Sequence, residues 1–344
     1  MDRRARLVQP LVPGSRGIEI GAWFAPLVPK REGWQTLVLD VFPTEELRQR
    51  AVADPNIPEA SRDAIEEVDL VGSAVAIAEL AEAAGHAPGS FDFVISSHNF
   101  EHLPDPIRFL QGVERLLRPG GVLSMAIPDR RSCFDHLRPP STLGQLLEAK
   151  LLGRERPGLA QLFDHATTTA ERLLPEGAAT PYFPLDGFPE QVRYGGDPAG
   201  ALALMQRLHA GQSEPYHDAH CWAFSPAEFA ALMIELRLLG LLRLEQCGAM
   251  FQEGVEFHVV LRKPEANEAP AAMPSRQDCA DLLMAERREM HLRWAIGQAP
   301  PPPEPPPPEP PPPPPAWFVL LRPLVPVRLR GPMRRLGRRA GLLG

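Results

Sequence analysis

Apolar and polar residues alternate along the first half of the chain in a way that predicts strands and helices in turn. The clearest stretch is Phe91–Asp129, which reads FDFVISSHNFEHLPDPIRFLQGVERLLRPGGVLSMAIPD. A short apolar run with the length of a buried strand ends at the polar residues Ser96–His102, and apolar residues then recur at helical spacing from Phe109. The turn Arg118–Gly121 ends that helix, and a second apolar run follows. Two buried strands joined through one helix form a βαβ unit, so we expect parallel strands here.

Similar patterns before this stretch extend the predicted sheet. Strands are predicted at Gly17–Ile20, at Thr36–Leu39 and, more weakly, at Ala64–Leu70, with a helix at Val75–Ala84. After Asp129 the alternation stops. Residues 130–220 are rich in Pro, Gly, Arg and His, and we interpret them as an insertion with helical patches such as Leu143–Leu152.

The alternation resumes after the insertion. Ser225, Pro226 and Glu228 have the residue types and spacing of an N-cap, a first-turn proline and a capping-box glutamate. A helix is therefore predicted from this point to about Leu239. Two strands that can pair antiparallel at one sheet edge are predicted at Leu242–Cys247 and Val255–Leu261.

The body is predicted to span 1–263, and three further segments follow it. Residues 264–299 are expected to be a helical extension, whose incomplete apolar stripe at Arg276–Ala295 fits either self-association or packing on the body. Residues 300–315 hold fourteen prolines and two glutamates, which predicts a polyproline II rod about 50 Å long at about 3.1 Å per residue. The rod would serve as a spacer or as a ligand of proline-recognition domains. Residues 316–344 contain seven arginines and no acidic residue, which predicts a basic amphipathic tail that binds an anionic membrane surface or an acidic protein partner, or stays solvated.

Composition narrows the class of protein. The net charge of −7 is unevenly spread, because the basic tail leaves the body more acidic, and an acidic body argues against nucleic acid as a ligand. The four cysteines form no C-x-x-C pair, so reduced structural thiols and a cytoplasmic location are expected. No apolar run is long enough for a signal peptide or a membrane span. If the tail binds lipid, the protein would lie peripherally at the inner membrane face.

The first predicted strand leads into a candidate cofactor site. Its end, GIEIG at Gly17–Gly21, places a glycine where a ligand can approach the backbone. The dinucleotide fingerprint G-x-G-x-x-G is absent, and Pro26 and Pro29 prevent a helix from starting directly after the turn. A cofactor without phosphate is therefore expected. Asp40 ends the second predicted strand, where a carboxylate can bind a ribose diol; the alternative is a turn aspartate.

The polar turn after the fourth strand carries a histidine–glutamate motif. Because ligands bind beyond the carboxyl ends of parallel strands, four residues are expected near a site: Ser97, His98, Glu101 and Asp129. His98–His102 has the H-x-x-E-H pattern of zinc proteases, but that chemistry needs both histidines on one helix. No helix is expected here, so no metal is predicted. A second group, His217, Asp218 and His220, is left with three interpretations: a metal site, a base, or structurally hydrogen-bonded side chains.

Together these features resemble class I S-adenosylmethionine-dependent methyltransferases over residues 1–263. A strand before an E-H-L motif, then a helix and L-R-P-G-G, is typical of that class. EIGAWFAP at Glu19–Pro26 resembles the E-I-G-x-x-x-x-P motif of a group associated with bacterial glycan and glycosyltransferase clusters, and VLDV resembles its second motif. Three further segments resemble other motifs of this group. Val68–Leu70 resembles the end of its third strand, and Asp129–Asp135 resembles its P-D-(K/R)-R-x-x-F-D motif. His217–Pro226 resembles its H-x-H-x-W-(T/S)-P motif, with one extra residue between the histidines. The chain departs from the wider family's E/D-x-G-x-G-x-G, of which only Gly21 remains.

The resemblance implies a fold and a set of site residues. The fold would be α/β, a Rossmann-like, doubly wound, mostly parallel seven-stranded sheet with an antiparallel edge strand and a helical insertion. The cofactor would be S-adenosylmethionine, bound by Glu19, Gly21, Ala22, Asp40, Val41, Asp69, Leu70, Ser97 and His98. The insertion would cover an acceptor bound by Asp129, Arg131, Asp135, Arg138 and His217. The candidate general bases are His98 and then His220, because a base with a pKa near 7 suits a hydroxyl or amine acceptor; otherwise His98 only shapes the wall of the site.

The expected function is in-line methyl transfer to a polar small molecule or a glycan, with O-methylation of a sugar as the expected reaction. The alternative is a catalytically silent scaffold, which would use the proline rod and the basic tail to recruit glycan enzymes to a membrane. Contact with a glycosyltransferase would then run through the tail. The chain retains the acidic residues of the three motifs, Glu19, Asp40 and Asp69, and this favours an active enzyme over a silent scaffold.

Overall fold

The computed structural model describes residues 2–174, 177–186, 191–213, 215–265, 267–268 and 272–297. The proline-rich segment predicted at 300–315 and the basic tail predicted at 316–344 lie outside these residues. Among the helices of the described residues, none is both long and apolar enough to cross a bilayer.

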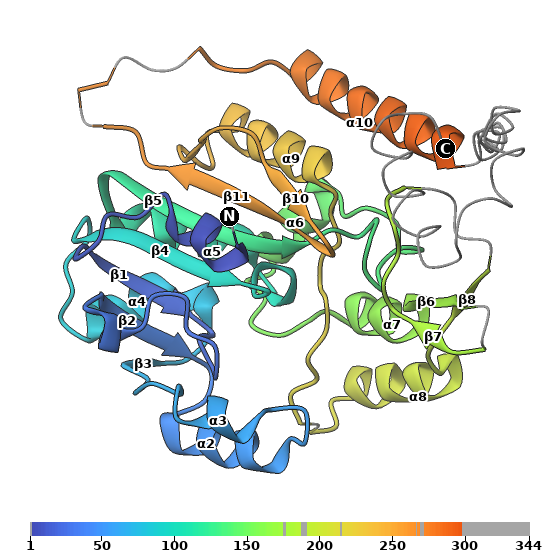
Figure 1. Ribbon diagram of the computed structural model, residues 1–344, viewed down its shortest axis with the longest axis horizontal. Helices are drawn as coiled ribbons and strands as arrows, with labels where there is room; N and C mark the ends of the chain where they lie inside the picture. The colour runs from blue at the N-terminus through green and yellow to red at the C-terminus, as the bar shows by residue number, and fades with distance from the viewer. Residues whose placement is uncertain are drawn as a thin grey trace, which may run out of the picture. The chain divides into compact units, whose positions relative to one another are not determined.

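One mixed sheet forms the core of the described body (Figure 1). Its parallel part runs in the order β3-β2-β1-β4-β5, with β1 at Arg16–Ile20, β2 at Gln35–Asp40, β3 at Leu70–Val71, β4 at Phe91–Ser97 and β5 at Leu117–Pro128. β11 (Glu256–Arg262) lies antiparallel beside β5, and β10 (Phe251–Glu253) and β9 (Glu245–Gln246) both pair with β11. The prediction of a Rossmann-like, mostly parallel sheet with an antiparallel edge is confirmed.

Two details of the sheet differ from the expectation. Within the described residues it has eight strands and not seven, because a turn at Gly254 (φ 58°) folds Phe251–Glu253 back onto β11 as an extra strand. The predicted strand at Ala64–Leu70 is wrong for most of its length. Only Leu70 and Val71 pair with β2, and α3 (Glu59–Arg62) precedes them.

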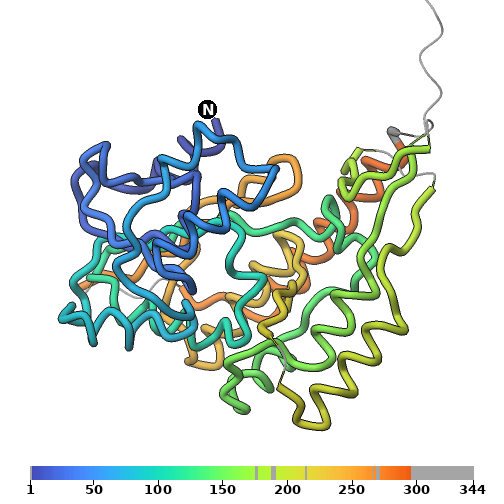
Figure 2. Tube along the Cα trace, turned by 90° about the horizontal axis from the view of Figure 1, so that it is seen from below, coloured from blue at the N-terminus to red at the C-terminus, as the bar shows by residue number. Residues whose placement is uncertain are grey.

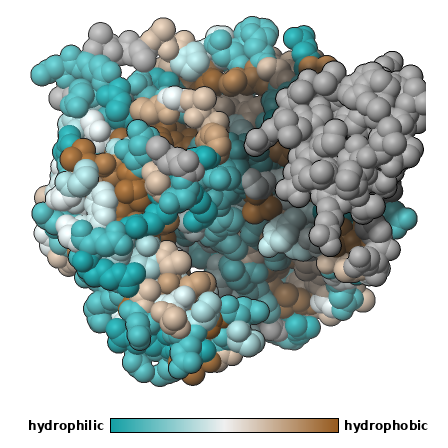
Figure 3. All heavy atoms as spheres, viewed as in Figure 1, coloured by the Kyte–Doolittle hydropathy of each residue, from teal (hydrophilic) through white to brown (hydrophobic). Residues whose placement is uncertain are grey.

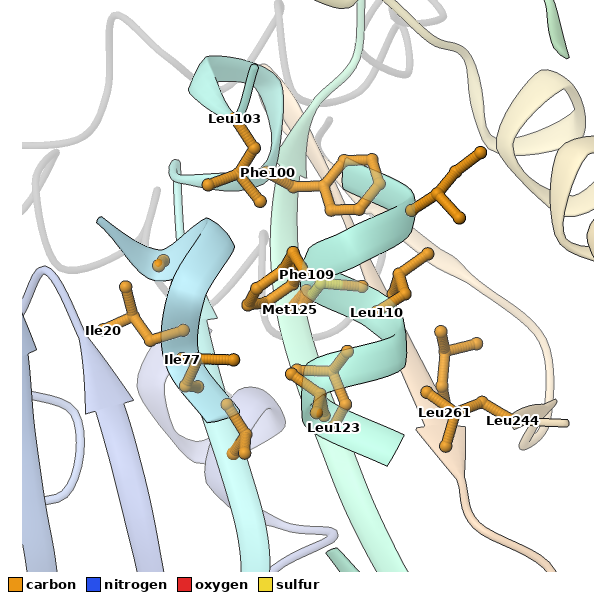
Figure 4. Packing of buried hydrophobic residues seen from close by; sticks show 14 of the residues in the cluster. Ile20, Ile77, Phe100, Leu103, Phe109, Leu110, Leu123, Met125, Leu244 and Leu261 are labelled. Atoms are coloured by element: carbon orange, nitrogen blue, oxygen red, sulfur yellow. The ribbon is translucent and has the colours of Figure 1, made fainter. Parts of the chain in front are cut away.

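One face of the sheet is covered by α5 (Pro106–Leu116), which is the helix that the opening pattern predicts. Asp105 caps it by accepting from Arg108 N at 2.9 Å, and Pro106 takes the first helical position, where no intrahelical donor is needed. Figure 4 shows Phe109 and Leu110 turned toward the apolar side chains of the sheet. Because these side chains are fully buried, each contributes roughly 1.5–3 kcal/mol to folding.

Three more helices complete this apolar layer. They are α4 (Ile77–Ala83), preceded by η2 (Ala74–Ala76), α6 (Leu143–Leu151) and α9 (Pro226–Leu238). α9 begins as predicted, because Ser225 Oγ accepts from Glu228 N and the Glu228 carboxylate accepts from Ser225 N at 2.7 Å. α6, which the sequence assigns to the insertion, buries Leu146 and Ala149 in the main core.

The opposite face has a different cover. α1 (Arg3–Val8) buries Leu7 against Phe93 and Ile95 of β4, together with Leu27 and Val28 of the loop that follows β1. This loop leads to η1 (Lys30–Glu32), and α2 (Thr44–Ala53) packs beyond β2 in a separate apolar cluster. The loop after β1 is therefore part of the core, which fixes its path past the carboxyl ends of the strands.

The insertion forms a lobe beside the sheet in both views (Figures 1 and 2). Apart from α6, the described residues of the insertion form the helices α7 (Leu159–Thr168) and α8 (Pro198–His209). It also contains a small antiparallel sheet that the sequence analysis did not predict, in the order β7-β6-β8 with β6 at Ala170–Leu173, β7 at Ala179–Thr180 and β8 at Val192–Tyr194.

The last described helix, α10 (Arg276–Gly297), lies along α9 (Figure 1). Its Cys279 thiol is buried and lies 3.6 Å from Ala231 O of α9. Of the two interpretations of this segment, packing on the body is the one observed. All four cysteines are free thiols, and Figure 3 shows that hydrophilic residues cover most of the visible face, with hydrophobic residues in small separate patches.

Candidate functional site

The carboxyl ends of the parallel strands meet at one edge, and the backbone is strained there. Gly21 (φ 65°) and Trp23 (φ 39°) follow β1, and His98 (φ 49°) follows β4. Among the described residues, Trp23 and His98 are the non-glycine residues with positive φ. Such conformations cost about 1–3 kcal/mol each and cluster at functional sites. Their place beside the strand ends marks this edge as the candidate site.

Glu19 holds the loop that follows β1. Its side chain is buried, and its two oxygens accept from Leu27 N at 2.6 Å and from Val28 N at 3.0 Å. Burial raises the pKa of this carboxyl to about 7, although the two N–H donors act in the opposite direction. The prediction of direct cofactor contact by Glu19 is therefore corrected, because the residue is only 2% exposed and both oxygens already accept from the loop. The side chain instead positions the turn that contains Gly21 and Ala22, and the Ala22 side chain is itself buried.

Asp40 stands at the strand-end edge, as the sequence predicts. It is the last residue of β2, and its Oδ1 accepts from Phe42 N at 3.0 Å. Burial raises the pKa of this carboxyl. A carboxylate has about four acceptor positions, so Asp40 keeps capacity for the two hydroxyls of a ribose. Val41 follows it and is 55% exposed, which leaves its side chain accessible to a ligand.

Asp69 and Leu70 do not occupy the edge, and this prediction is corrected. Asp40 pairs in register with Val71, so β3 ends one residue later than Leu70. Asp69 Oδ2 accepts from Val38 N at 2.7 Å and lies 2.6 Å from Lys30 Nζ, while Leu70 is part of the main core. The residues that leave the strand end beside Asp40 are Gly72 and Ser73, and Gly72 N donates to Asp40 O at 2.8 Å.

Ser97 and His98 meet a buried carboxylate on the antiparallel strand. Glu256, the first residue of β11, lies 2.6 Å from His98 Nε2 through Oε2 and 2.6 Å from His258 Nε2 through Oε1. Arg3 of α1 donates to both Glu256 oxygens, at 2.6 and 2.9 Å, and to Ser97 Oγ at 2.5 Å. These partners hold the pKa of Glu256 well below its usual range, against the effect of burial. A permanently charged Glu256 therefore orients His98, whose side chain is 40% exposed.

A second cluster lies on the other side of His98. Glu101 is in the short helix η3 (Phe100–His102), and its Oε1 lies 3.6 Å from His98 Nδ1, 3.6 Å from His102 Nε2 and 4.0 Å from His220 Nε2. His220 comes from the end of the insertion, and its Nδ1 lies 2.6 Å from Asp135 Oδ2. The structure thus brings together His98 and His220, the two predicted bases, around a glutamate that both flank.

Asp129 and Arg131 bind each other, which corrects their assignment as acceptor contacts. Asp129 is fully buried and accepts from Arg131 N at 2.9 Å, from its Nε at 2.9 and 3.1 Å and from its Nη2 at 2.6 Å. Arg131 Nη1 lies 3.0 Å from Glu286 Oε1 on α10. With its donors shared between two carboxylates, Arg131 fastens α10 to the turn after β5.

Asp135 and Arg138 are likewise used inside the protein. Arg138 is 5% exposed and donates to His220 O and Cys221 O, the latter at 3.0 Å. Asp135 is 4% exposed and holds the His220 ring. Direct contact with an acceptor is therefore corrected to a positioning role for both side chains. His217, the remaining predicted acceptor contact, is half-buried on the segment that leads to His220.

Three site residues were missed by the sequence analysis: Arg3, Glu256 and His258. Glu256 and His258 alternate with apolar residues in a strand, so both fall on one face, and two ionisable groups there are a signal that could have found them. Arg3 carries no such signal, because its partners lie 94 and 253 positions away.

The edge fits S-adenosylmethionine on three counts. Asp40 offers acceptors for a ribose diol, the positive φ of Gly21 lets the backbone approach a ligand closely, and no phosphate-binding helix N-terminus follows β1. Asp40 and the backbone around Gly21 are the groups that would hold this cofactor.

Comparisons with known proteins relate the chain to methyltransferases. A family model for a methyltransferase domain matches residues 1–236, and no curated protein matches the chain. One similar solved structure is an S-adenosylmethionine-dependent methyltransferase from Methanosarcina mazei, with 17% sequence identity, coverage of 77% of this chain and 100% of that chain, and a TM-score of 0.37. Another is an S-adenosylmethionine-dependent methyltransferase from Mesorhizobium loti, with 16% sequence identity, coverage of 75% of this chain and 95% of that chain, and a TM-score of 0.35. A third, from Aquifex aeolicus, has 13% identity over 76% of this chain and 89% of that chain, with a TM-score of 0.36.

The assignment rests on the family model, because it spans well over half of the chain and ends within α9. It covers β1 to β5 and the insertion, and therefore the edge that carries Gly21, Asp40 and His98. The chain belongs to the methyltransferase-domain family and is a class I S-adenosylmethionine-dependent methyltransferase.

Proposed function

We propose that this enzyme methylates a hydroxyl group of a polar acceptor, and that the acceptor is a sugar or a glycan. The observation that carries the hydroxyl part is the placement of His98, a partly exposed imidazole at the strand-end edge whose Nε2 is 2.6 Å from the Glu256 carboxylate. The sugar class is supported by the motif resemblance at Glu19–Pro26 and His217–Pro226.

The chemistry defines what the protein has to supply. S-adenosylmethionine brings a methyl group on a sulfonium, which is already activated for displacement. The acceptor oxygen attacks the methyl carbon, the carbon–sulfur bond breaks, and its electron pair leaves with the sulfur. The protein therefore has to hold the acceptor oxygen in line with the methyl group and to accept the proton that the hydroxyl loses.

His98 is suited to accept that proton. If Glu256 takes the Nε2–H, Nδ1 is the basic nitrogen, and it faces Glu101 Oε1 at 3.6 Å. A proton gained at Nδ1 would place an imidazolium between two carboxylates, those of Glu256 and Glu101. The same pattern of base and orienting carboxylate recurs in many acid–base sites.

A panel of acceptors tests the proposal. Purified enzyme and S-adenosylmethionine are incubated with sugar nucleotides, free oligosaccharides and, as a contrast, primary amines, and the methylated products are identified by mass spectrometry. The expected result is a methyl ether on a sugar. His98→Gln should lower kcat by about 10²–10⁴ with unchanged binding of the cofactor, whereas His209→Gln, on an exposed helix end, should match the wild type. Methylation of amines alone, or a His98→Gln enzyme with full kcat, would overturn the proposal.

A further inference from the structure

The side chains of Glu101, His102 and His220 converge although they come from two distant segments of the chain. One ligand atom from each lies within 4.8 Å of the others. Glu101 and His102 belong to η3 after β4, and His220 lies just before α9. The sequence predicts no metal at the H-x-x-E-H segment, because no helix is expected there, and leaves a metal as one of three interpretations for the group that contains His220. The fold supplies the third side chain from elsewhere.

Glu101 is buried without a hydrogen-bond partner. The residue is 1% exposed, and neither carboxylate oxygen has a hydrogen bond from any group among the described residues. A buried carboxylate that lacks partners costs several kcal/mol, so native proteins pair such groups or use them to bind a cation. The nearest candidate donors are imidazole nitrogens at 3.6–4.0 Å from Oε1, which is beyond hydrogen-bond distance.

These separations match the spacing of ligands around a small cation. Zinc binds histidine nitrogen and carboxylate oxygen at about 2.0–2.2 Å, so neighbouring ligand atoms in a tetrahedral site stand about 3.3–3.6 Å apart. The Glu101 Oε1 to His102 Nε2 distance is 3.6 Å and the Glu101 Oε1 to His220 Nε2 distance is 4.0 Å. Movements of a few tenths of an ångström at these two contacts, together with a closer approach of the two imidazoles, whose ligand atoms lie within 4.8 Å, would close the site on an ion.

Carboxylates also stand behind both histidines. His220 Nδ1 is 2.6 Å from Asp135 Oδ2, and His102 Nδ1 is 2.9 Å from Asp218 Oδ1. Metal-binding histidines almost always present their second nitrogen to a carboxylate, a carbonyl or a water, which fixes the ring and the tautomer. With the proton on Nδ1, beside these carboxylates, each Nε2 would keep its lone pair for an ion next to Glu101.

We propose that Glu101, His102 and His220 bind one divalent transition-metal ion. Two imidazoles and one carboxylate suit Zn²⁺ or Fe²⁺ better than Mg²⁺ or Ca²⁺, which prefer all-oxygen sites. Three protein ligands leave a coordination position open, as in catalytic metal sites. The His102 side chain is 26% exposed, so the ion can enter from that side. The proposal concerns metal binding and does not depend on the identity of the methyl acceptor.

Metal binding is measured on the full chain after dialysis against a chelator. Titration with Co²⁺ is expected to reach one equivalent per chain, with the visible absorption of a four- or five-coordinate ion, and Zn²⁺ should displace it. Elemental analysis of the protein as purified identifies the ion that it carries from the cell. Calorimetry with S-adenosylmethionine alone confirms that the dialysed protein is folded.

Matched variants separate the site from adventitious binding. Glu101→Gln and His102→Ala should abolish stoichiometric binding, and Asp218→Asn, behind His102, should weaken it by about 10–100-fold. His136→Gln is the control, because His136 is a half-buried histidine that contacts Arg131 O outside the cluster. A folded wild-type protein that takes up no cobalt, or Glu101→Gln and His102→Ala proteins that bind it like the wild type, would overturn the proposal.

Discussion

Glu256 Oε2 lies 2.6 Å from His98 Nε2, so the first residue of the antiparallel strand orients the residue that follows β4. The contact joins two segments that are 158 positions apart in the sequence. It gives the candidate base a fixed tautomer and a fixed direction. The antiparallel strand β11 therefore contributes to the site as well as extending the sheet beyond β5.

Glu256→Gln is expected to lower kcat by about 10–100-fold, a part of what general-base catalysis supplies. The neutral amide is a weaker acceptor for the Nε2–H of His98 and orients the ring less firmly, whereas the KM for S-adenosylmethionine should change little. Steady-state kinetics with the acceptor found in the panel provide the measurement. Glu253→Gln, on the neighbouring strand and paired only at the surface with Arg6, is the control, and an equal kcat in both variants would contradict the positioning role.

Asp40→Asn should weaken binding of S-adenosylmethionine by about 10–100-fold, since a hydrogen bond to a charged group contributes about 1.5–3 kcal/mol. Titration calorimetry measures this directly. Asp54→Asn changes an aspartate in an exposed turn after α2 and should bind the cofactor like the wild type. If both variants bind equally well, Asp40 is only a turn residue.

Stability should depend on pH through Glu19. Its pKa is about 7 in the folded protein and 4.5 in an ordinary setting. Between these values the folded state binds more protons than the unfolded chain, so the free energy of unfolding rises as pH falls from 7 to 4.5. The contribution amounts to ~3 kcal/mol and is flat outside this window.

Urea unfolding of wild type and Glu19→Gln at pH 5 and pH 7.5 measures this contribution. The wild type should gain more stability than the variant on going to pH 5, because glutamine does not titrate. Parallel pH dependence in the two proteins would show that Glu19 is ionised throughout.

Glu286→Ala should destabilise the fold by about 1–3 kcal/mol, because it leaves the partly buried Arg131 with one carboxylate fewer and removes an acceptor from Ser225 Oγ. Chemical denaturation is the measurement. Glu289→Ala, an exposed position on the same helix that pairs with Arg293, should change stability by less than about 0.5 kcal/mol. An unchanged stability of Glu286→Ala, together with a raised KM for the acceptor, would restore Arg131 as a substrate contact.

The arginine-rich segment 316–344 is expected to bring the enzyme to anionic membranes, since each basic residue near such a surface contributes about 1 kcal/mol. Sedimentation with phosphatidylglycerol vesicles should pellet the full chain but not a 1–299 truncation, and high salt should release it. Equal pelleting of both proteins would remove this role, whereas pelleting of neither would favour a protein partner.

Sequence reasoning succeeded where a feature depends on neighbours along the chain. The helices α5 and α9 are examples, because the N-caps Asp105 and Ser225 and the apolar residues of each helix lie within one short segment of sequence. The positions of Gly21 and Asp40 could be predicted because each lies at the end of a strand that the apolar pattern indicates. The prediction of β3 failed because this strand has only two residues, which is too short for an apolar run to show where it ends. Asp69 was therefore placed at the edge although it lies behind it.

The remaining errors have a different cause. Asp129, Arg131, Asp135 and Arg138 lie in a polar, proline-rich region, where charged residues are usually solvated, but all four are buried or partly buried. Asp129 binds Arg131, and the other three have partners on α10 or in the segment around His220. The pairing of Glu101 with His220 is likewise set by the path of the whole insertion. Such contacts can be read only after the fold has brought distant segments together.

The positive φ values of Trp23 and His98 have a consequence for engineering. A glycine at either position would relieve about 1–3 kcal/mol of backbone strain. A screen that selects only for heat resistance would therefore favour losing the imidazole that this edge presents. Thermostable variants of this enzyme should be sought elsewhere in the chain, with residues 23 and 98 held constant.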